Sequence, residues 1–220
     1  MNRRLTQRGK DRRRQLMDYA ARRFAENGYH PTSVAEIVQG MGVGKGVFYW
    51  YFSSKEELFL EILREAQTDL RRRQQQVIGD SEDPVERIEL GIRATMGWLA
   101  ENRHLSGLFQ FAASEERFAP ALRRGQEVAV ADVVRHVKEG IVAGRIRDSD
   151  PQVLSHAILG VTNHLARTFI FERAEPADAV ADAAIAFCRD GLLGPARPAA
   201  VAAGAGAGAN RASSRRGAGF

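Results

Sequence analysis

Apolar residues recur at helical spacing along most of the chain. In residues 11–27, Leu16, Ala20 and Phe24 follow one another at intervals of four, which places them on one face of a helix. Residues 1–10 are basic and lack this pattern, so we expect them to form a disordered arm. The first predicted element is therefore a helix preceded by a charged arm.

A second, shorter helix is predicted after a new start signal. Ser33 and Glu36 have the spacing of a capping box, and the apolar side of this helix ends near Gly40. The segment Gly40–Gly44 contains three glycines, each of which costs roughly 1 kcal/mol inside a helix. It is therefore expected to form a tight turn.

The turn leads into Gly44–Phe52, which ends in five consecutive aromatic residues. Local propensity favours a strand here. We predict a helix instead, because the chain offers no partner strand and the residues divide into two faces on a helical wheel. One face holds Phe48, Tyr51 and Phe52, and the other holds Lys45, Gly46, Tyr49 and Trp50.

The rest of the pattern stays helical and gives an all-α fold of about nine helices, with a small N-terminal three-helix unit and a larger bundle. The later predicted helices run from the cap at Ser53 and Ser54 to about Gln76, from Asp83 past Leu99, and over residues 104–113, 119–143, 151–172 and 176–193. In the last two, the expected buried residues are Leu154, Ile158, Val161, Leu165 and Phe169, then Val180, Ala184 and Phe187. We expect three regions: residues 1–57, 58–194, and an Ala/Gly-rich disordered tail, 195–220.

Charge is distributed unevenly along the chain. Residues 1–60 hold 11 Lys and Arg against 6 Asp and Glu, residues 61–194 hold 17 against 21, and residues 195–220 hold 4 against none. A basic N-terminal part on an acidic body indicates a polyanionic partner at one end. The alternative is that both basic ends are ordinary solvated tails.

Composition narrows the class of protein further. The single cysteine, Cys188, rules out an internal disulfide and is typical of a reducing compartment. The sequence shows no apolar run of membrane-spanning length and no signal peptide, so we expect no membrane partner and a cytoplasmic location. Neither a metal site nor a cofactor site is indicated by the spacing of His, Cys, Asp and Glu. The absence of a catalytic constellation or a phosphate loop argues against an enzyme.

A short helix, a tight turn and a second short helix with a polar outer face form a helix-turn-helix, whose second helix enters the major groove of DNA. Lys45 suits a guanine edge, Gly46 allows close approach, and Val47 suits a thymine methyl group. The side chains expected to donate to phosphates are those of Tyr49, Trp50, Tyr51 and Lys55, together with Thr32 and Ser33 at the start of the first of these helices. Alternatively, Tyr51 belongs to the core, and Trp50 anchors against the next helix.

These residues carry a family resemblance. The pattern Thr32-x-x-x-Glu36-Ile37-Val38-x-x-x-Gly42-Val43-x-Lys45-Gly46-Val47-Phe48-Tyr49-x-Tyr51-Phe52-x-Ser54-Lys55-Glu56-x-Leu58 resembles the DNA-binding signature of the TetR (tetracycline-repressor-like) transcriptional regulators. The resemblance implies a homodimeric repressor that binds a palindromic operator on double-stranded DNA and is released by a small-molecule effector. Residues 1–57 would then bind DNA, and residues 58–194 would bind the effector and form the dimer.

Two departures from the family pattern concern the turn and the start of the second helix. Gly44 stands where the family has Ser or Thr, so the recognition helix has no side-chain cap and is expected to fray without DNA. Gly40 and Met41 replace small alanine-like residues, which is expected to loosen the turn.

The second half of the chain offers candidates for two further surfaces. Aromatic, His and Asn side chains that could line an effector pocket are Trp98, His104, Phe109, Phe111, His136, Asn163 and His164. Late apolar and small residues that the resemblance places in a four-helix dimer interface are Ala157, Gly160, Val161, His164, Ala183, Ala184 and Phe187. The alternative in both cases is that these residues only complete the monomer core or its surface.

Two other functions remain open from the sequence. The first is a DNA-binding protein of the same fold without a small-molecule effector, controlled by a protein partner or acting as an organiser. The second is an enzyme or carrier built on a helical bundle, for which the sequence offers no buried pair of titratable residues as a candidate.

Overall fold

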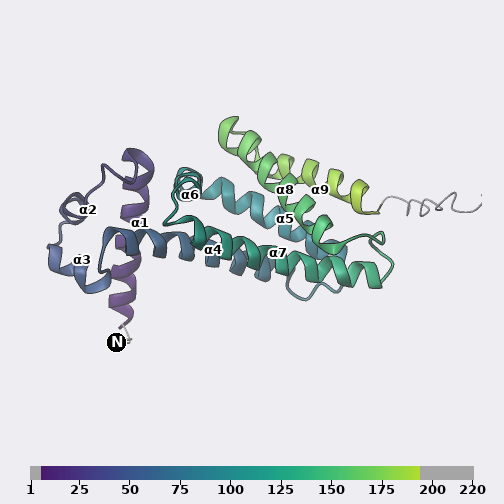
Figure 1. The fold of residues 1–220 in the computed structure, drawn as a ribbon, viewed down its shortest axis with the longest axis horizontal. Helices are drawn as coiled ribbons and strands as arrows, with labels where there is room; N and C mark the ends of the chain where they lie inside the picture. Colours follow the sequence, from purple (N-terminus) through teal and green to yellow (C-terminus); the bar gives the residue numbers. More distant parts are fainter. Residues whose placement is uncertain (1–5, 194–220) are drawn as a thin grey trace, which may run out of the picture.

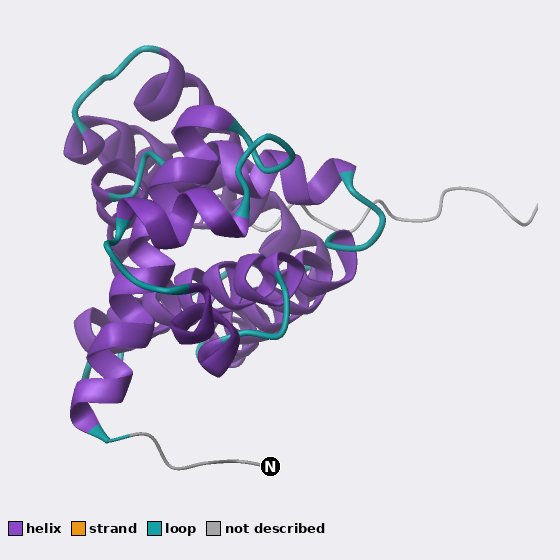
Figure 2. Cartoon of the chain, turned by 90° about the vertical axis from the view of Figure 1, so that its left-hand side faces the viewer, coloured by secondary structure: helices purple, strands orange, loops and turns teal. Residues whose placement is uncertain are grey.

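The computed structural model describes residues 6–193, and this part of the chain is entirely helix and turn, which confirms the all-α prediction (Figures 1 and 2). It contains nine α-helices and one π-helix. In chain order they are α1 (Gln7–Asn27), α2 (Val34–Gly40), α3 (Lys45–Tyr51), α4 (Lys55–Ile78), α5 (Pro84–Glu101), α6 (Leu105–Ser114), α7 (Ala119–Val142), α8 (Pro151–Leu165), η1 (Ala166–Glu172) and α9 (Ala177–Leu193).

The helices form a small unit at one end and an elongated body. Figure 1 shows α1, α2 and α3 together at the left, with α4 running from them along the body. In the body, α4 packs on α5 and α7, α5 packs on α9, and α7 packs on α8. The helix α6 lies at the junction, where it contacts both α1 and α7. Among the described residues, no helix is both long enough and apolar enough to cross a membrane.

The first helix begins earlier than the sequence pattern indicates. The Thr6 hydroxyl accepts a hydrogen bond from the Gly9 N–H at 3.2 Å, so α1 starts at Gln7. The expectation of a disordered arm over residues 1–10 is therefore wrong for its last four residues, because a cap at Thr6 starts the helix before the apolar pattern does. Residues 1–5 of the arm, like the tail predicted at 195–220, lie outside the described residues.

The predicted seam of the helix over 151–172 needs correction. The buried positions after Ile158 are Thr162, Ala166 and Ile170, whereas Val161, Leu165 and Phe169 are half-buried at its edge. The buried positions Ile158, Thr162, Ala166 and Ile170 follow at intervals of four, whereas the predicted seam takes a step of three from Ile158 to Val161, so the shift begins inside α8, before the π geometry that starts at Ala166. In α9, Val180 and Ala184 are buried as predicted, but Phe187 is 66% exposed, and Cys188 takes the inner position.

Two hydrophobic clusters divide the molecule. The first joins α1, α2, α3 and the first half of α4 to Trp98, α6 and Phe118. The second joins α5, the C-terminal half of α7, α8, η1 and α9. The core of the N-terminal unit thus extends through α6 to the residue that precedes α7.

Candidate nucleic-acid interface

The helices α2 and α3 are joined by a short turn with defined caps. The Ser33 hydroxyl accepts the Glu36 N–H at 3.1 Å, which starts α2. Gly42 has φ +63°, a conformation that glycine adopts without strain, and the Val43 N–H donates to the Val38 carbonyl at 2.9 Å. Gly44 precedes α3 without a side-chain cap, as the sequence indicates.

The aromatic run is a helix, as predicted, and its inner face is fully packed. Phe48 and Phe52 are buried, and their ring centroids lie 5.9 Å apart. The Arg13 guanidinium lies 5.0 Å from the centroid of the Phe52 ring, so α1 borders the end of α3. Both phenylalanines thus belong to the core, where they fix the orientation of the opposite face of α3.

That opposite face is open to solvent. Tyr49 is 56% exposed and Trp50 52% exposed, although large aromatic side chains are usually buried. Lys45 and Gly46 are exposed as well, and a Cβ added at Gly46 would meet no atom within 4 Å. Val47 and Tyr51 are half-buried, and Ser33, a predicted contact at the N-cap of α2, is exposed. A helix with one locked face and one aromatic, cationic face is suited to insertion into a groove.

Two of the predicted phosphate contacts point inward instead. The Thr32 side chain is buried, and its hydroxyl donates to the Gly28 carbonyl at 2.8 Å. The Lys55 ammonium donates to the carbonyls of Tyr29, His30 and Thr32 at 2.8, 3.3 and 2.9 Å. A phosphate contact by either side chain would require it to give up one of these bonds.

The first helix braces α2 through an ion pair and a close packing contact. Arg23 Nη2 donates to Glu36 Oε1 at 2.6 Å, and this hydrogen bond is the main cause that lowers the pKa of Glu36. A Cβ at Gly40 would lie 1.8 Å from the Tyr19 hydroxyl oxygen, so glycine is what makes room for Tyr19. The structure gives Gly40 a packing role beside Tyr19, and the expectation that Gly40 loosens the turn stays a prediction.

An aromatic cluster, which the sequence pattern does not predict, connects this unit to the body. Tyr29 stacks on Phe111 of α6 at a centroid distance of 5.3 Å and meets Phe59 and Phe118 edge-on at 4.9 and 5.2 Å. Burial raises the pKa of Tyr29. The Arg117 guanidinium lies 5.3 Å from the centroid of the Tyr29 ring. Tyr29 lies in a loop without helical periodicity, so the restricted backbone of the neighbouring Pro31 is the one sequence signal that this loop is ordered.

The side chains predicted to line an effector pocket do not converge. Trp98 is buried and donates through Nε1 to Asp69 Oδ2 at 2.8 Å, while Phe109 and Phe111 pack half-buried against the N-terminal cluster. His136 is buried in α7, where burial lowers its pKa and Nδ1 has no hydrogen-bond partner. The other three, His104, Asn163 and His164, are exposed.

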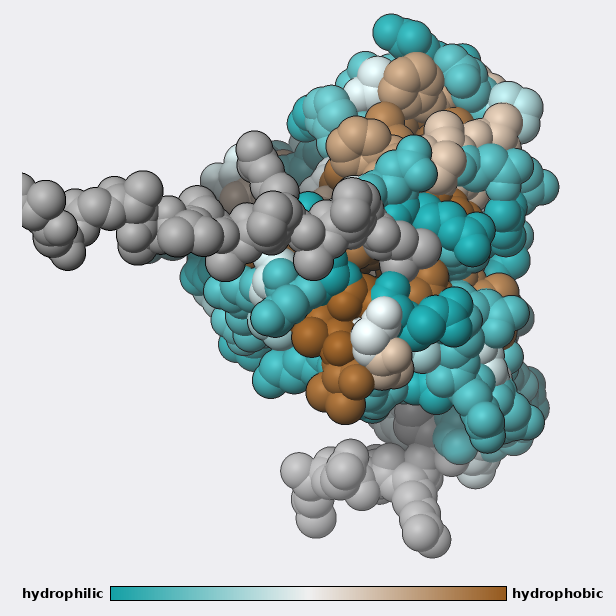
Figure 3. Space-filling model, turned by 90° about the vertical axis from the view of Figure 1, so that its right-hand side faces the viewer, coloured by the Kyte–Doolittle hydropathy of each residue, from teal (hydrophilic) through white to brown (hydrophobic). Residues whose placement is uncertain are grey.

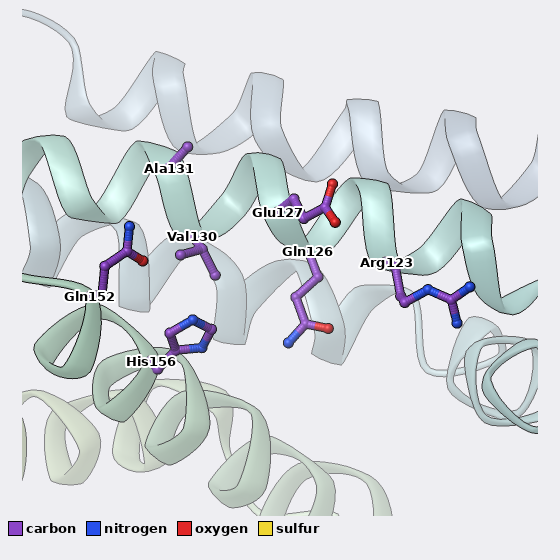
Figure 4. A pocket seen from close by; sticks show the side chains of 7 residues that line it. All are labelled: Arg123, Gln126, Glu127, Val130, Ala131, Gln152 and His156. Atoms are coloured by element: carbon purple, nitrogen blue, oxygen red, sulfur yellow. The ribbon is translucent and has the colours of Figure 1, made fainter.

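Two open cavities lie elsewhere on the body. The first, of about 420 Å³, lies between α7 and α8 and is shown in Figure 4. It is lined by Arg123, Gln126, Glu127, Val130, Ala131, Gln152 and His156. The second, of about 450 Å³, lies among α4, α5 and α9. Within residues 6–193, no group of three or more His, Cys, Asp or Glu side chains could hold a metal ion.

Most residues predicted for a dimer interface are accessible on α8 and α9. Ala157, Gly160, His164 and Ala183 are exposed, Phe187 projects from α9, Val161 is half-buried, and Ala184 alone is fully buried inside the monomer. Further exposed apolar surface gathers at the end of the body opposite α1–α3 (Figure 3). At this end, Val142, the last residue of α7, is 89% exposed.

Comparison with known proteins agrees with this geometry. Residues 16–62 match the family described as bacterial regulatory proteins, tetR family, and residues 81–192 match the tetracyclin repressor-like C-terminal domain. The fatty acid metabolism regulator protein of Bacillus subtilis is 24% identical, over 71% of this chain and 82% of that protein.

Two solved structures share the fold over most of the chain. The ketosteroid transcriptional regulator KstR2 of Mycobacterium tuberculosis has a TM-score of 0.65 and 26% identity, covering 83% of this chain and 95% of that one. The transcriptional regulator FadR of Bacillus subtilis, in complex with stearoyl-CoA, has a TM-score of 0.73 and 22% identity, covering 81% of this chain and 98% of that one.

Proposed function

The chain belongs to the TetR family of bacterial regulatory proteins, and we propose that it is a homodimeric repressor that leaves a palindromic operator when a small molecule binds its body. The observation that carries the proposal is the open face of α3, with Tyr49 and Trp50 exposed over a locked inner face. Residues 1–57 would supply the DNA contacts in the cytoplasm, and residues 58–194 would supply the effector site and the dimer. The relatives are regulators, which supports a role without catalysis.

In the proposed complex, α3 lies in the major groove and α2 crosses the backbone. Lys45, Gly46 and Val47 at the start of α3 face base edges, where a lysine suits the acceptors of guanine. Tyr49, Trp50 and Tyr51 further along α3 donate to phosphates, as does the exposed hydroxyl of Ser33. The contacts of Thr32 and Lys55 indicate that both position the α1–α2 loop rather than bind DNA.

The dimer is proposed to form through α8 and α9. A Cβ at Gly160 would meet no atom within 4 Å, so Gly160→Arg should leave the monomer folded and obstruct a closely packed partner helix. Gly107→Arg, on the equally open α6, is the matched control. Size-exclusion chromatography with light scattering should give the mass of a monomer for Gly160→Arg and that of a dimer for Gly107→Arg. A dimer in both cases would move the interface away from α8.

Release by an effector requires a ligand that binds one conformation of the body better than the other. Support comes from the relative named as a fatty acid regulator and from the structure with stearoyl-CoA. The α7–α8 cavity is within the size range of small-molecule sites, and α7 begins directly after Phe118 of the aromatic cluster. A ligand that shifts α7 could therefore disturb the packing of Tyr29 and, through it, the loop that carries α2.

The test starts from DNA that the protein itself selects from a random library. Lys45→Ala should change base preference by about 1–3 kcal/mol at one position per half-site. Tyr49→Phe should weaken binding to all sequences alike. Failure of the wild-type protein to enrich any sequence, or unchanged affinity in both variants, would refute the assignment of α3. Stearoyl-CoA added to the complex should then lower its affinity for DNA, if the effector belongs to the acyl-CoA class.

The second candidate is a DNA-binding regulator of the same fold that answers to a protein partner. It is favoured by the scattered positions of the predicted pocket residues, of which Trp98 and His136 are buried in separate places. If selected DNA is bound but a panel of acyl-CoA and steroid ligands leaves both its affinity and the melting temperature unchanged, this candidate is preferred.

A further inference from the structure

The first turns of α1 carry three exposed cations, Arg8, Lys10 and Arg12. Within residues 6–193, none of them takes part in an ion pair. The arginines that follow differ, because Arg13 and Arg14 pair with glutamates of α4. Positive charge is thus neutralised where α1 meets α4, and it is left free toward the start of α1.

Two of the three cations lie on the side of α1 that faces the helix-turn-helix. Arg8 and Arg12 continue, at intervals of four and seven residues, a stripe that includes Tyr19 and Arg23. Tyr19 packs against Gly40 and Arg23 pairs with Glu36, so this stripe meets both ends of α2. Lys10, two residues from either arginine, projects from a different side of the helix.

The same segment of α1 lies close to the end of the recognition helix. Arg13 contacts the ring of Phe52, the residue directly after α3. Figure 1 shows the N-terminal end of α1 projecting past α3 on that side of the molecule. A duplex that receives α3 in its major groove carries closely spaced phosphates along both edges of that groove. Cations that lie beside α3 can therefore reach them.

We propose that Arg8 and Arg12 bind phosphates of the operator next to the groove entered by α3, as a second DNA-binding surface independent of the helix-turn-helix. The inference rests on the proposed function. It assigns the two arginines to affinity and register, and not to base preference, because phosphate contacts carry no sequence information. Each neutralised phosphate contributes about 0.9 to the slope of log affinity against log salt.

The test compares two doubly substituted full-length proteins. Arg8→Gln/Arg12→Gln removes the proposed contacts, and Lys10→Gln/Lys138→Gln removes two exposed charges from another face of α1 and from the body. On the DNA selected by the wild type, the first variant should bind at least about tenfold more weakly, with unchanged base preference and a salt slope lower by about 3.6, because a dimer loses two contacts from each protomer. The control should keep the wild-type slope, and both should keep the wild-type melting temperature.

A scan with neutral methylphosphonates, placed singly along the same duplex, separates contact from general attraction. The wild type should lose affinity at a set of positions, and the arginine variant should be insensitive at a few of them while the control responds like the wild type. Equal behaviour of the two variants, or an arginine variant that keeps every sensitive position, overturns the inference. If Lys45→Ala and Tyr49→Phe still weaken binding in that case, the proposed function survives it.

Discussion

Replacing Lys55 by methionine distinguishes the two roles that sequence and structure give this residue. The family pattern assigns its ammonium to a DNA phosphate. In the structure, the ammonium instead holds three carbonyls of the α1–α2 loop and lies 4.4 Å from the centroid of the Tyr29 ring. Methionine keeps the length and most of the apolar stem of lysine, so the substitution removes the donors with little change in packing.

The expected cost follows from those contacts. A hydrogen bond to a charged group contributes about 1.5–3 kcal/mol. The sum over three such bonds overstates the net contribution of Lys55 to the free energy of unfolding. Lys55 is half-buried and burial lowers its pKa, so part of the gain offsets desolvation of the ammonium. Water can also reach the exposed His30 carbonyl after truncation. We therefore expect a net loss of about 2 kcal/mol in the free energy of unfolding, or a melting temperature lower by about 4–8 °C.

The assay is thermal unfolding at fixed protein concentration, paired with DNA binding across a salt series. Lys45→Met is the matched control, because Lys45 is exposed on α3. Lys55→Met should lower the melting temperature and leave the salt slope unchanged at temperatures where it is folded. Lys45→Met should change the free energy of unfolding by no more than about 0.5 kcal/mol and should weaken binding to the selected DNA, because Lys45 is proposed to face a base edge. A stable Lys55→Met protein whose salt slope falls by about 1.8, or about 0.9 for each protomer of the dimer, would refute the structural role.

Two further predictions concern the body. Gly140→Ala should cost about 1–3 kcal/mol in urea unfolding, because its Cβ would lie 2.5 Å from Cδ1 of the buried Ile146; an unchanged midpoint would show that Ile146 moves freely. Burial and then the charge of Arg135 lower the pKa of His136, so the unfolded chain takes up a proton below about pH 6.5, and the folded protein does so only at lower pH. Stability should thus fall with pH below that value by up to about 1.4 kcal/mol per unit, and His136→Met should remove this component.

Local signals in the sequence were sufficient to predict where the helices lie and which face of α3 is buried. Periodicity and caps placed α2, α4, α5 and α9 within a few residues, because those signals act between neighbours in the chain. The strand-like run became a helix because no partner strand exists within the described chain and because its two faces suit a half-buried helix. Phe48 and Phe52 could be assigned to the core on that basis alone.

Long-range contacts explain what the sequence could not predict. Thr32 and Lys55 point inward because they donate to backbone carbonyls of the α1–α2 loop. Every residue type has such a carbonyl, so the sequence does not show where these acceptors lie. The effector-pocket candidates were chosen by residue type, and residue type does not reveal that Trp98 pairs with Asp69. The seam of α8 shifted at Thr162 because steps of three and of four after Ile158 both fit helical spacing, and only packing against neighbouring helices decides between them.

The core of the N-terminal unit includes residues from α4, α6 and the α6–α7 connection. This limits where the chain can be joined to parts of its relatives. A chimera that joins residues 1–57 to a foreign sensor would lose Phe59, Phe111 and Phe118, the three rings that enclose Tyr29. Such a hybrid would expose an aromatic face of the donor and leave the loop before α2 without support. A functional exchange of operator specificity should instead replace only the exposed positions of α3, or transfer α6 and the α6–α7 connection together with the first four helices.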